Sequence, residues 1–140
     1  MNKYKFLDLY VNMSETFKYT VTEEKLLLFK KLTGDVNPLH CSEKYSKKKG
    51  YKGKVVYGML SASLISTFCG VYLPGEYSFI RQMEVKFHRP VFVGEVLTIK
   101  GIVKEIYESV KQAIIKVDIM NIDDEKVVSG LVYVCFVNED

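Results

Sequence analysis

The sequence predicts an α+β fold in which a long antiparallel β-sheet wraps around one buried α-helix. Residues 58–73 are apolar on nearly every side, and a helix of that kind is normally buried. The second half of the chain instead has strand composition in four long segments, 77–89, 96–108, 112–123 and 126–137. Together with a shorter strand at 16–21, these segments provide enough sheet to curl around the apolar helix.

The strand assignments depend on alternation and on turn signals. In segment 77–89, three apolar residues alternate with three polar ones, Met83, Val85 and Phe87 against Glu84, Lys86 and His88. A period of two is typical of a strand with one buried face. The residues NIDDEK at 121–126 favour turns, so they predict a hairpin between the last two strands.

Two further helices are predicted in the first half of the chain. Thr22 can cap a helix that has Glu23 and Glu24 in its first turn, and Gly34 is suited to end it. Its apolar residues include the three- and four-residue spacings of a helix, at Leu26, Leu27, Phe29 and Leu32. The segment SEKYSKK predicts a short second helix, with Ser42 as its cap and Glu43 in its first turn.

Length and composition describe one ordinary packed domain. A chain of 140 residues fits a single domain, 1–140, and its hydrophobic share of 48% is enough for a core. No apolar run is long enough to cross a bilayer, so we expect no membrane partner. The first residues, MNKYKFLDLYVNM, contain Asp8 and lack a small-residue cleavage site. They do not resemble a secretory signal, and a cytoplasmic location is expected.

Cysteine usage and charge exclude further classes of protein. Cys41, Cys69 and Cys135 form neither a CxxC pair nor an even set, which favours reduced thiols and no metal site. A net charge of +3 is too small to indicate a nucleic-acid partner. Six lysines nevertheless fall within 44–54, KYSKKKGYKGK. Such a cluster can hold phosphate groups, although a solvated surface loop is the simpler interpretation.

The segment LTGDVNPLH, residues 32–40, combines an acid and an imidazole with strong turn formers. In a helix, Asp35 and His40 would differ by about 140° around the axis and would point apart. Pro38 disfavours the helical conformation for Asn37 and removes a backbone donor. We therefore expect an irregular turn over 35–40 that can direct both side chains to one place.

Several ordered motifs together resemble one enzyme family. FKKLTGDVNPLH, YGMLSAS, LPG and FHRPVFVGE follow one another over residues 16–137 as they do in the MaoC-like, (R)-specific enoyl-CoA hydratase family. The resemblance implies the hot-dog fold, a homodimer and a thioester substrate. The implied reaction of fatty-acid metabolism is hydration of a trans-2-enoyl-CoA to an (R)-3-hydroxyacyl-CoA, or the reverse dehydration. No separate cofactor is implied, since coenzyme A is part of the substrate.

The resemblance also assigns catalytic roles. The family's catalytic acid and histidine fall on Asp35 and His40, with Asn37 helping to hold the turn. Hydration needs a base to take a proton from water and an acid to deliver one to C2, and these two groups can supply both. The sequence does not settle how they divide the proton transfer. Taken singly, Asp35 is as well explained by a turn hydrogen bond and His40 by a structural role.

The start of the apolar helix matches the family's oxyanion site. Backbone N–H groups there can polarise a carbonyl, and a glycine lets the substrate approach closely. By resemblance Gly58 donates its N–H to the thioester oxygen. Ser66 lies about two turns later and matches a small polar family position near the catalytic pair. The alternative interpretation of Ser66 is that it is a small packing residue, because the helix has many small residues.

Substrate contacts are implied at six positions. Tyr57 stands where the family commonly has histidine, and Ser42 where it commonly has an acid, so we expect Tyr57 to shape the substrate pocket. Cys69 and Tyr133 match positions that line the acyl pocket, and the bulk of Tyr133 predicts a short acyl group. In the lysine-rich segment, Lys48, Lys49 and Lys52 are the candidates for the phosphates of coenzyme A.

Two alternatives to the CoA hydratase stay open on the sequence. The first is dehydration of a 3-hydroxyacyl group on an acyl carrier protein, an acidic partner that the same lysines could bind. The second is a non-catalytic module that binds acyl thioesters, which the presence of both Asp35 and His40 disfavours. Thioesterase chemistry is disfavoured because the GDxNPLH pattern is typical of the hydratases.

Overall fold

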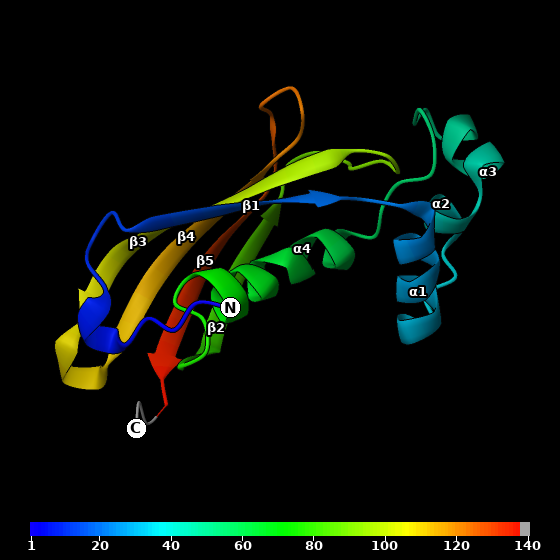
Figure 1. Cartoon of the computed structure of the whole chain (residues 1–140). Coiled ribbons are helices and arrows are strands. Elements are labelled where there is room, and N and C mark those ends of the chain that lie inside the picture. The colour runs from blue at the N-terminus through cyan, green and yellow to red at the C-terminus, as the bar shows by residue number, and fades with distance from the viewer. Residues whose placement is uncertain (138–140) are drawn as a thin grey trace.

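A curved antiparallel sheet forms the body of the molecule (Figure 1). The computed structural model describes residues 1–137, which form a five-stranded sheet of order β1-β3-β4-β5-β2. The strands are β1 (Ser14–Thr20), β2 (Ser78–Phe87), β3 (Val96–Tyr107), β4 (Gln112–Met120) and β5 (Lys126–Phe136). Neighbouring strands pair antiparallel throughout. The predicted strands are confirmed to within a few residues at each end.

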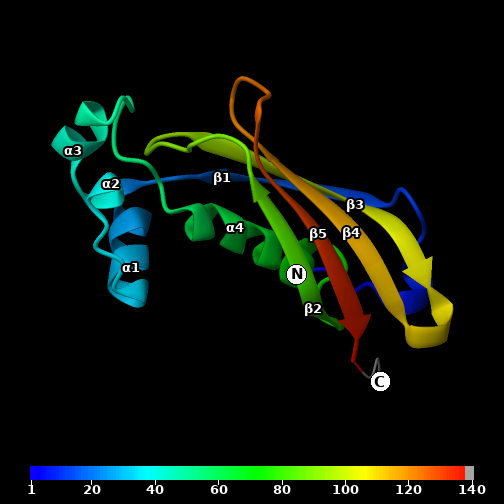
Figure 2. The same ribbon diagram turned by 180° about the vertical axis from the view of Figure 1, so that it is seen from behind.

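The apolar helix lies along the concave face of the sheet, as predicted. Helix α4 (Gly58–Thr67) continues into a wider helical turn, η2 (Phe68–Tyr72), and the sheet curves around both (Figures 1 and 2). Leu73 leaves the helix in an extended conformation, which the following proline favours. Ile65 and Phe68 are fully buried against fully buried residues of the strands such as Ile99 and Ile115. This α+β arrangement is the hot-dog fold.

Three short helices lie together at one end of the sheet (Figures 1 and 2). They are α1 (Glu23–Thr33), α2 (Pro38–Cys41) and α3 (Glu43–Lys48), and single 3₁₀ turns occur at η1 (Phe6–Asp8) and η3 (Glu108–Val110). The Thr22 hydroxyl caps α1 by accepting from Lys25 N–H, and Gly34 ends it with φ 73°. The Ser42 hydroxyl caps α3 by accepting from Tyr45 N–H. Both predicted helices and their caps are therefore confirmed.

The predicted irregular turn over 35–40 is only partly correct. Irregular backbone extends from Gly34 to Asn37, but Pro38 begins α2, so His40 is helical. The physical reason is that proline at the first helical position loses no intrahelical hydrogen bond and already has the φ that a helix needs. Pro38 does exclude Asn37 from the helix, and the Asn37 side chain caps it instead.

Within residues 1–137, no helix is both long and apolar enough to span a bilayer. The three cysteines are free thiols, in agreement with the prediction from their spacing. Among the same residues, no three His, Cys, Asp or Glu side chains gather as metal ligands would.

Candidate active site

The backbone around Asp35 is held by side-chain hydrogen bonds within the turn. Asp35 Oδ1 accepts from Asn37 N–H at 2.9 Å, and Asn37 Oδ1 accepts from Leu39 N–H at 2.9 Å. The Asp35 N–H donates to the Thr33 hydroxyl at 3.2 Å. Asp35 is exposed, and this bonding pattern uses one of its two carboxylate oxygens, so Oδ2 is available to a substrate or water.

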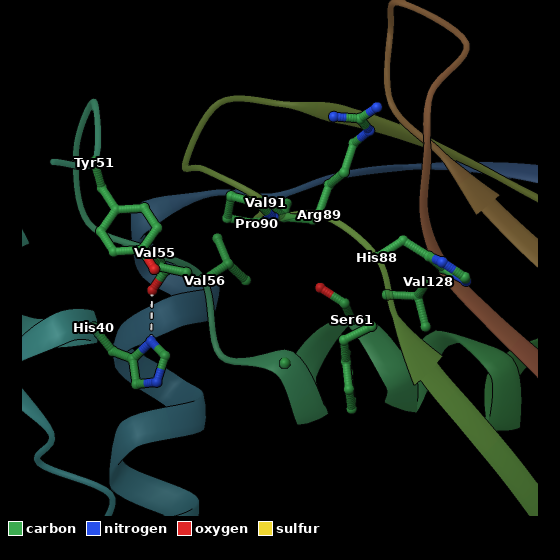
Figure 3. A pocket seen from close by; sticks show the side chains of 12 residues that line it. His40, Tyr51, Val55, Val56, Ser61, His88, Arg89, Pro90, Val91 and Val128 are labelled. Atoms are coloured by element: carbon green, nitrogen blue, oxygen red, sulfur yellow. Dashed lines mark hydrogen bonds between the residues drawn. The ribbon is translucent and has the colours of Figure 1, made fainter.

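His40 is oriented by a carbonyl oxygen behind it. Its Nδ1 lies 2.7 Å from the backbone oxygen of Val55, the bond drawn in Figure 3. A carbonyl can only accept, so Nδ1 carries the proton and Nε2 of the neutral ring is a free acceptor. The Val55 N–H also donates to Leu39 O at 3.2 Å, so the backbone of Val55 holds α2 at two points. The imidazole can therefore accept a hydrogen bond from water through Nε2.

Tyr57 joins the Asp35 turn to the start of α4. Its side chain is buried, with the ring 4.2 Å from the His40 ring and 5.1 Å from the Phe29 ring between centroids. The phenol O–H donates to the backbone oxygen of Asp35 at 2.8 Å. Burial, with contributions from the Cys41 thiol and the nearby Asp35, holds the pKa of the Tyr57 phenol well above its usual value of 10. The phenol is therefore a neutral donor at any physiological pH.

Two cavities meet at His40, Gly58 and Phe87. The first, of about 380 Å³, is also lined by Asp35, Tyr57 and apolar neighbours. The second, of about 300 Å³, extends over α4 toward Ser61, His88 and Arg89 (Figure 3). Because the two cavities share the residues at their junction, an elongated ligand can place its reacting atoms there and extend in both directions.

Gly58 lies where an anion or a polarised carbonyl would be stabilised. As the first residue of α4, its N–H has no acceptor within the helix and lies at the positive end of the helix dipole. A Cβ at this position would lie 3.1 Å from a Phe87 ring carbon, so the absence of a side chain lets the ring approach closely. The geometry therefore suits the predicted oxyanion role of Gly58.

Ser66 lies away from this junction in the single chain. It is exposed, and neither cavity that His40 lines includes it, whereas Ser61 is buried and lines the second cavity. Eight residues rotate about 80° around a helix beyond two full turns, so Ser66 does not share the face of Gly58. Ser61, three residues after Gly58, lies about 60° to the other side.

The two residues predicted to line an acyl pocket are also outside these cavities. Cys69 is 1% exposed within the hydrophobic core, and Tyr133 is half-buried on β5. Burial raises the pKa of the Cys69 thiol to about 12, so the sulfur is protonated and acts as an apolar packing group.

The lysine-rich segment borders the second cavity through Tyr51, which lies among its lysines. Lys48 and Lys49 at the end of α3 are exposed. Lys52 pairs with Glu95 at 3.2 Å, and its ammonium lies 4.5 Å above the Phe92 ring. These lysines therefore lie on the segment that carries Tyr51 but line neither the second cavity nor the junction.

Most residues that line the second cavity were not among the predicted site residues, and three of them lie at the end of β2 or just after it. Phe87 lies against Gly58, and His88 and Arg89 follow it at the end of β2. The His88 Nε2 lies 2.7 Å from the Ser129 hydroxyl on β5. The alternation of segment 77–89 predicts Phe87 on the inner face of the strand, but no local signal indicates that β2 ends beside α4.

Comparison with known proteins agrees with the fold and with the order of the motifs. The family model described as "MaoC like domain" matches residues 12–127. An (R)-specific enoyl-CoA hydratase of Rhodospirillum rubrum is 34% identical over 104 residues, 71% of this chain and 72% of that protein. A 3-hydroxybutyryl-CoA dehydratase of Methylorubrum extorquens is 29% identical over 125 residues, 89% of this chain and 79% of that protein.

Comparison with solved structures also identifies (R)-hydratases as similar proteins. The (R)-hydratase from A. caviae involved in PHA biosynthesis superposes with a TM-score of 0.88 at 28% identity. The alignment covers 92% of this chain and 98% of that one. With a family model that matches most of its length and a relative above 30% identity over two thirds of it, the chain belongs to the MaoC-like family of hot-dog proteins.

Proposed function

We propose that this protein is an (R)-specific enoyl-CoA hydratase, which also catalyses the reverse dehydration of a 3-hydroxyacyl-CoA. The observation that carries the proposal is the junction at which Asp35, His40 and the N-terminus of α4 line one cavity. Relatives named as hydratases and dehydratases place the chain among the hydro-lyases. The substrate supplies coenzyme A, and the proposed chemistry needs no other cofactor.

The proposed mechanism uses groups that converge on one water molecule. Asp35 Oδ2 takes a proton from water while His40 Nε2 accepts the second O–H and orients the molecule. The water oxygen bonds to C3, and the electron pair of the double bond moves toward the thioester oxygen as an enolate. The Gly58 N–H at the dipole end of α4 stabilises that charge. The Asp35 carboxyl then returns its proton to C2, which balances the addition.

We further propose that the working form is a homodimer. The strand β2 is an edge of the sheet and has exposed Phe79 and Phe87 side chains. An open edge with exposed aromatic residues favours pairing with another chain. Ser66, Cys69 and Tyr133 line neither cavity of the single chain, so the roles near the substrate proposed for them depend on this assembly. A bulky Tyr133 favours short acyl chains.

The proposal is tested by incubating the protein with crotonyl-CoA and separating the product on a chiral column. We expect net addition of water that gives (R)-3-hydroxybutyryl-CoA, with slower turnover of longer trans-2-enoyl-CoA substrates. An (S) product would contradict the mechanism, and faster turnover of long chains would contradict the role of Tyr133. If CoA thioesters are inert, the same acyl group on an acyl carrier protein distinguishes a carrier-dependent dehydratase from a non-catalytic binding module.

Lys48, Lys49 and Lys52 are proposed to hold the phosphates of coenzyme A. Changing all three to glutamine should raise KM for crotonyl-CoA by roughly 3- to 100-fold and leave kcat unchanged, because exposed ion pairs contribute about 0.2–1 kcal/mol each. The increase should shrink at high salt, which screens the wild-type attraction. The same change at Lys100, Lys104 and Lys111, on β3 and the turn before β4, is the matched control. An unchanged KM in the first variant would rule out this phosphate site.

A further inference from the structure

The side chain of Tyr57 contacts both proposed catalytic residues, and its backbone directly precedes the proposed oxyanion donor, Gly58. The Tyr57 ring packs on the His40 ring, its hydroxyl bonds to the Asp35 carbonyl, and its own backbone precedes Gly58. The ring is 2% exposed, so these contacts are shielded from solvent. Tyr57 therefore spans three elements of the site: the turn, α2 and the start of α4.

Asp35 and His40 are attached to the fold by different contacts. His40 is held through Val55, which bonds to its ring and to Leu39. The turn bonds of Asp35 to Thr33 and Asn37 fix its local shape but not its position relative to α4. Among the hydrogen bonds of the described residues, the bond from Tyr57 is the one that ties Asp35 to a residue outside 33–37. Removing this bond should free the carboxylate and leave the imidazole in place.

We infer that Tyr57 is a positioning residue that sets the Asp35 carboxylate at its working distance from His40, an inference that rests on the proposed function. The phenol acts through the Asp35 backbone and needs no contact with the reacting atoms. Its proton is committed to the Asp35 oxygen, so the Cys41 thiol, 3.6 Å away, is the donor to the phenol oxygen. The hydroxyl is therefore satisfied on both sides, which fixes its direction.

The test compares Tyr57→Phe with wild type. Phenylalanine keeps the ring packed on His40 and removes the bond to Asp35. We expect kcat for crotonyl-CoA to fall by about 10- to 100-fold, because small misplacements of a catalytic group are costly, while KM changes less than about 2-fold. Tyr4→Phe is the matched control, since it removes a partly buried tyrosine hydrogen bond to Glu15 far from the site and should keep wild-type kcat. Wild-type kcat in Tyr57→Phe would overturn the inference.

A double-variant cycle separates positioning from general loosening. If Tyr57 acts through the Asp35 carboxylate, Tyr57→Phe should lower kcat no further once Asp35→Asn is present. An equal loss of activity in both backgrounds would identify a merely structural residue and contradict the inference.

A second measurement does not depend on activity. The N–H of Asn37, bonded to Asp35 Oδ1, should exchange its hydrogen at least several-fold faster in Tyr57→Phe, whereas exchange of the Ser42 N–H, which bonds to Pro38 O at the end of α2, should not change. If Asn37 exchange is unaltered, Tyr57 does not fix the turn, whatever the enzyme's substrate. If exchange changes but the wild-type protein hydrates no thioester, the positioning role stands and the proposed function fails.

Discussion

Replacing Asp35 by asparagine is expected to lower kcat for the hydration of crotonyl-CoA by about 10²- to 10⁴-fold, the usual contribution of a positioned general base. KM should change little, because asparagine has nearly the same shape. The amide oxygen can still accept from Asn37 N–H, so the turn that presents the side chain persists. The loss would therefore report the missing basic oxygen rather than a rearranged loop.

The measurement is steady-state hydration of crotonyl-CoA, with the melting temperature of each variant as a check of folding. Asp8→Asn is a suitable control, because Asp8 also accepts a backbone N–H, from Lys5 at 2.8 Å. Asp8 lies in η1, at the opposite end of β1 from helices α1–α3. Its substitution should therefore leave kcat within about 2-fold of the wild-type value. An Asp35→Asn enzyme with similarly unaltered turnover would show that another group removes the proton.

Much of the fold follows from local pattern. Long alternating segments with turn formers between them define strands, and an apolar helix of about 15 residues must be covered. Capping residues predicted where the helices begin and end, since the hydroxyls of Thr22 and Ser42 cap the starts of α1 and α3 and Gly34 ends α1 with a positive φ. These features depend on neighbours within a few residues, which is why the sequence alone could predict them.

The parts of the site that depend on distant residues could not be predicted in this way. The bond between Tyr57 and Asp35 joins positions 22 apart, and Phe87 reaches Gly58 because β2 ends beside α4. Residue spacing on one helix did not indicate Ser61 either, because counting turns from Gly58 leads to Ser66, whereas Ser61 is the serine of α4 that lines the second cavity of the single chain. Spacing within a helix is thus a weaker guide to which residues line a site than the elements against which the helix packs.

Gly101 shows how a local signal can indicate a contact without naming the partner. A glycine inside a strand commonly marks a place where another group approaches closely. In the structure that group is the fully buried Phe68 of η2, and a Cβ at position 101 would lie 2.2 Å from its ring. The widened turn of η2 thus packs an aromatic ring directly onto the backbone of β3.

The overpacking in Gly101→Ala is accordingly expected to cost about 3 kcal/mol, the upper part of the usual range for overpacking a core. Phe68 is 0% exposed and its ring cannot bend away, so the backbone has to shift. Alanine restricts the unfolded chain and recovers roughly 0.4–1 kcal/mol, which offsets part of this cost. The net loss should lower the melting temperature by roughly 10 °C, measured by calorimetry at fixed protein concentration.

Gly130→Ala on β5 is the comparison that makes this prediction specific to Phe68. There the added Cβ would lie 2.8 Å from Ile65 Cδ1, the far end of a side chain that can rotate. We expect a loss of about 1 kcal/mol at that position, since a terminal methyl group can move where a ring edge cannot. If Gly101→Ala were no less stable than Gly130→Ala, the close packing of η2 against β3 would not be a rigid part of this fold.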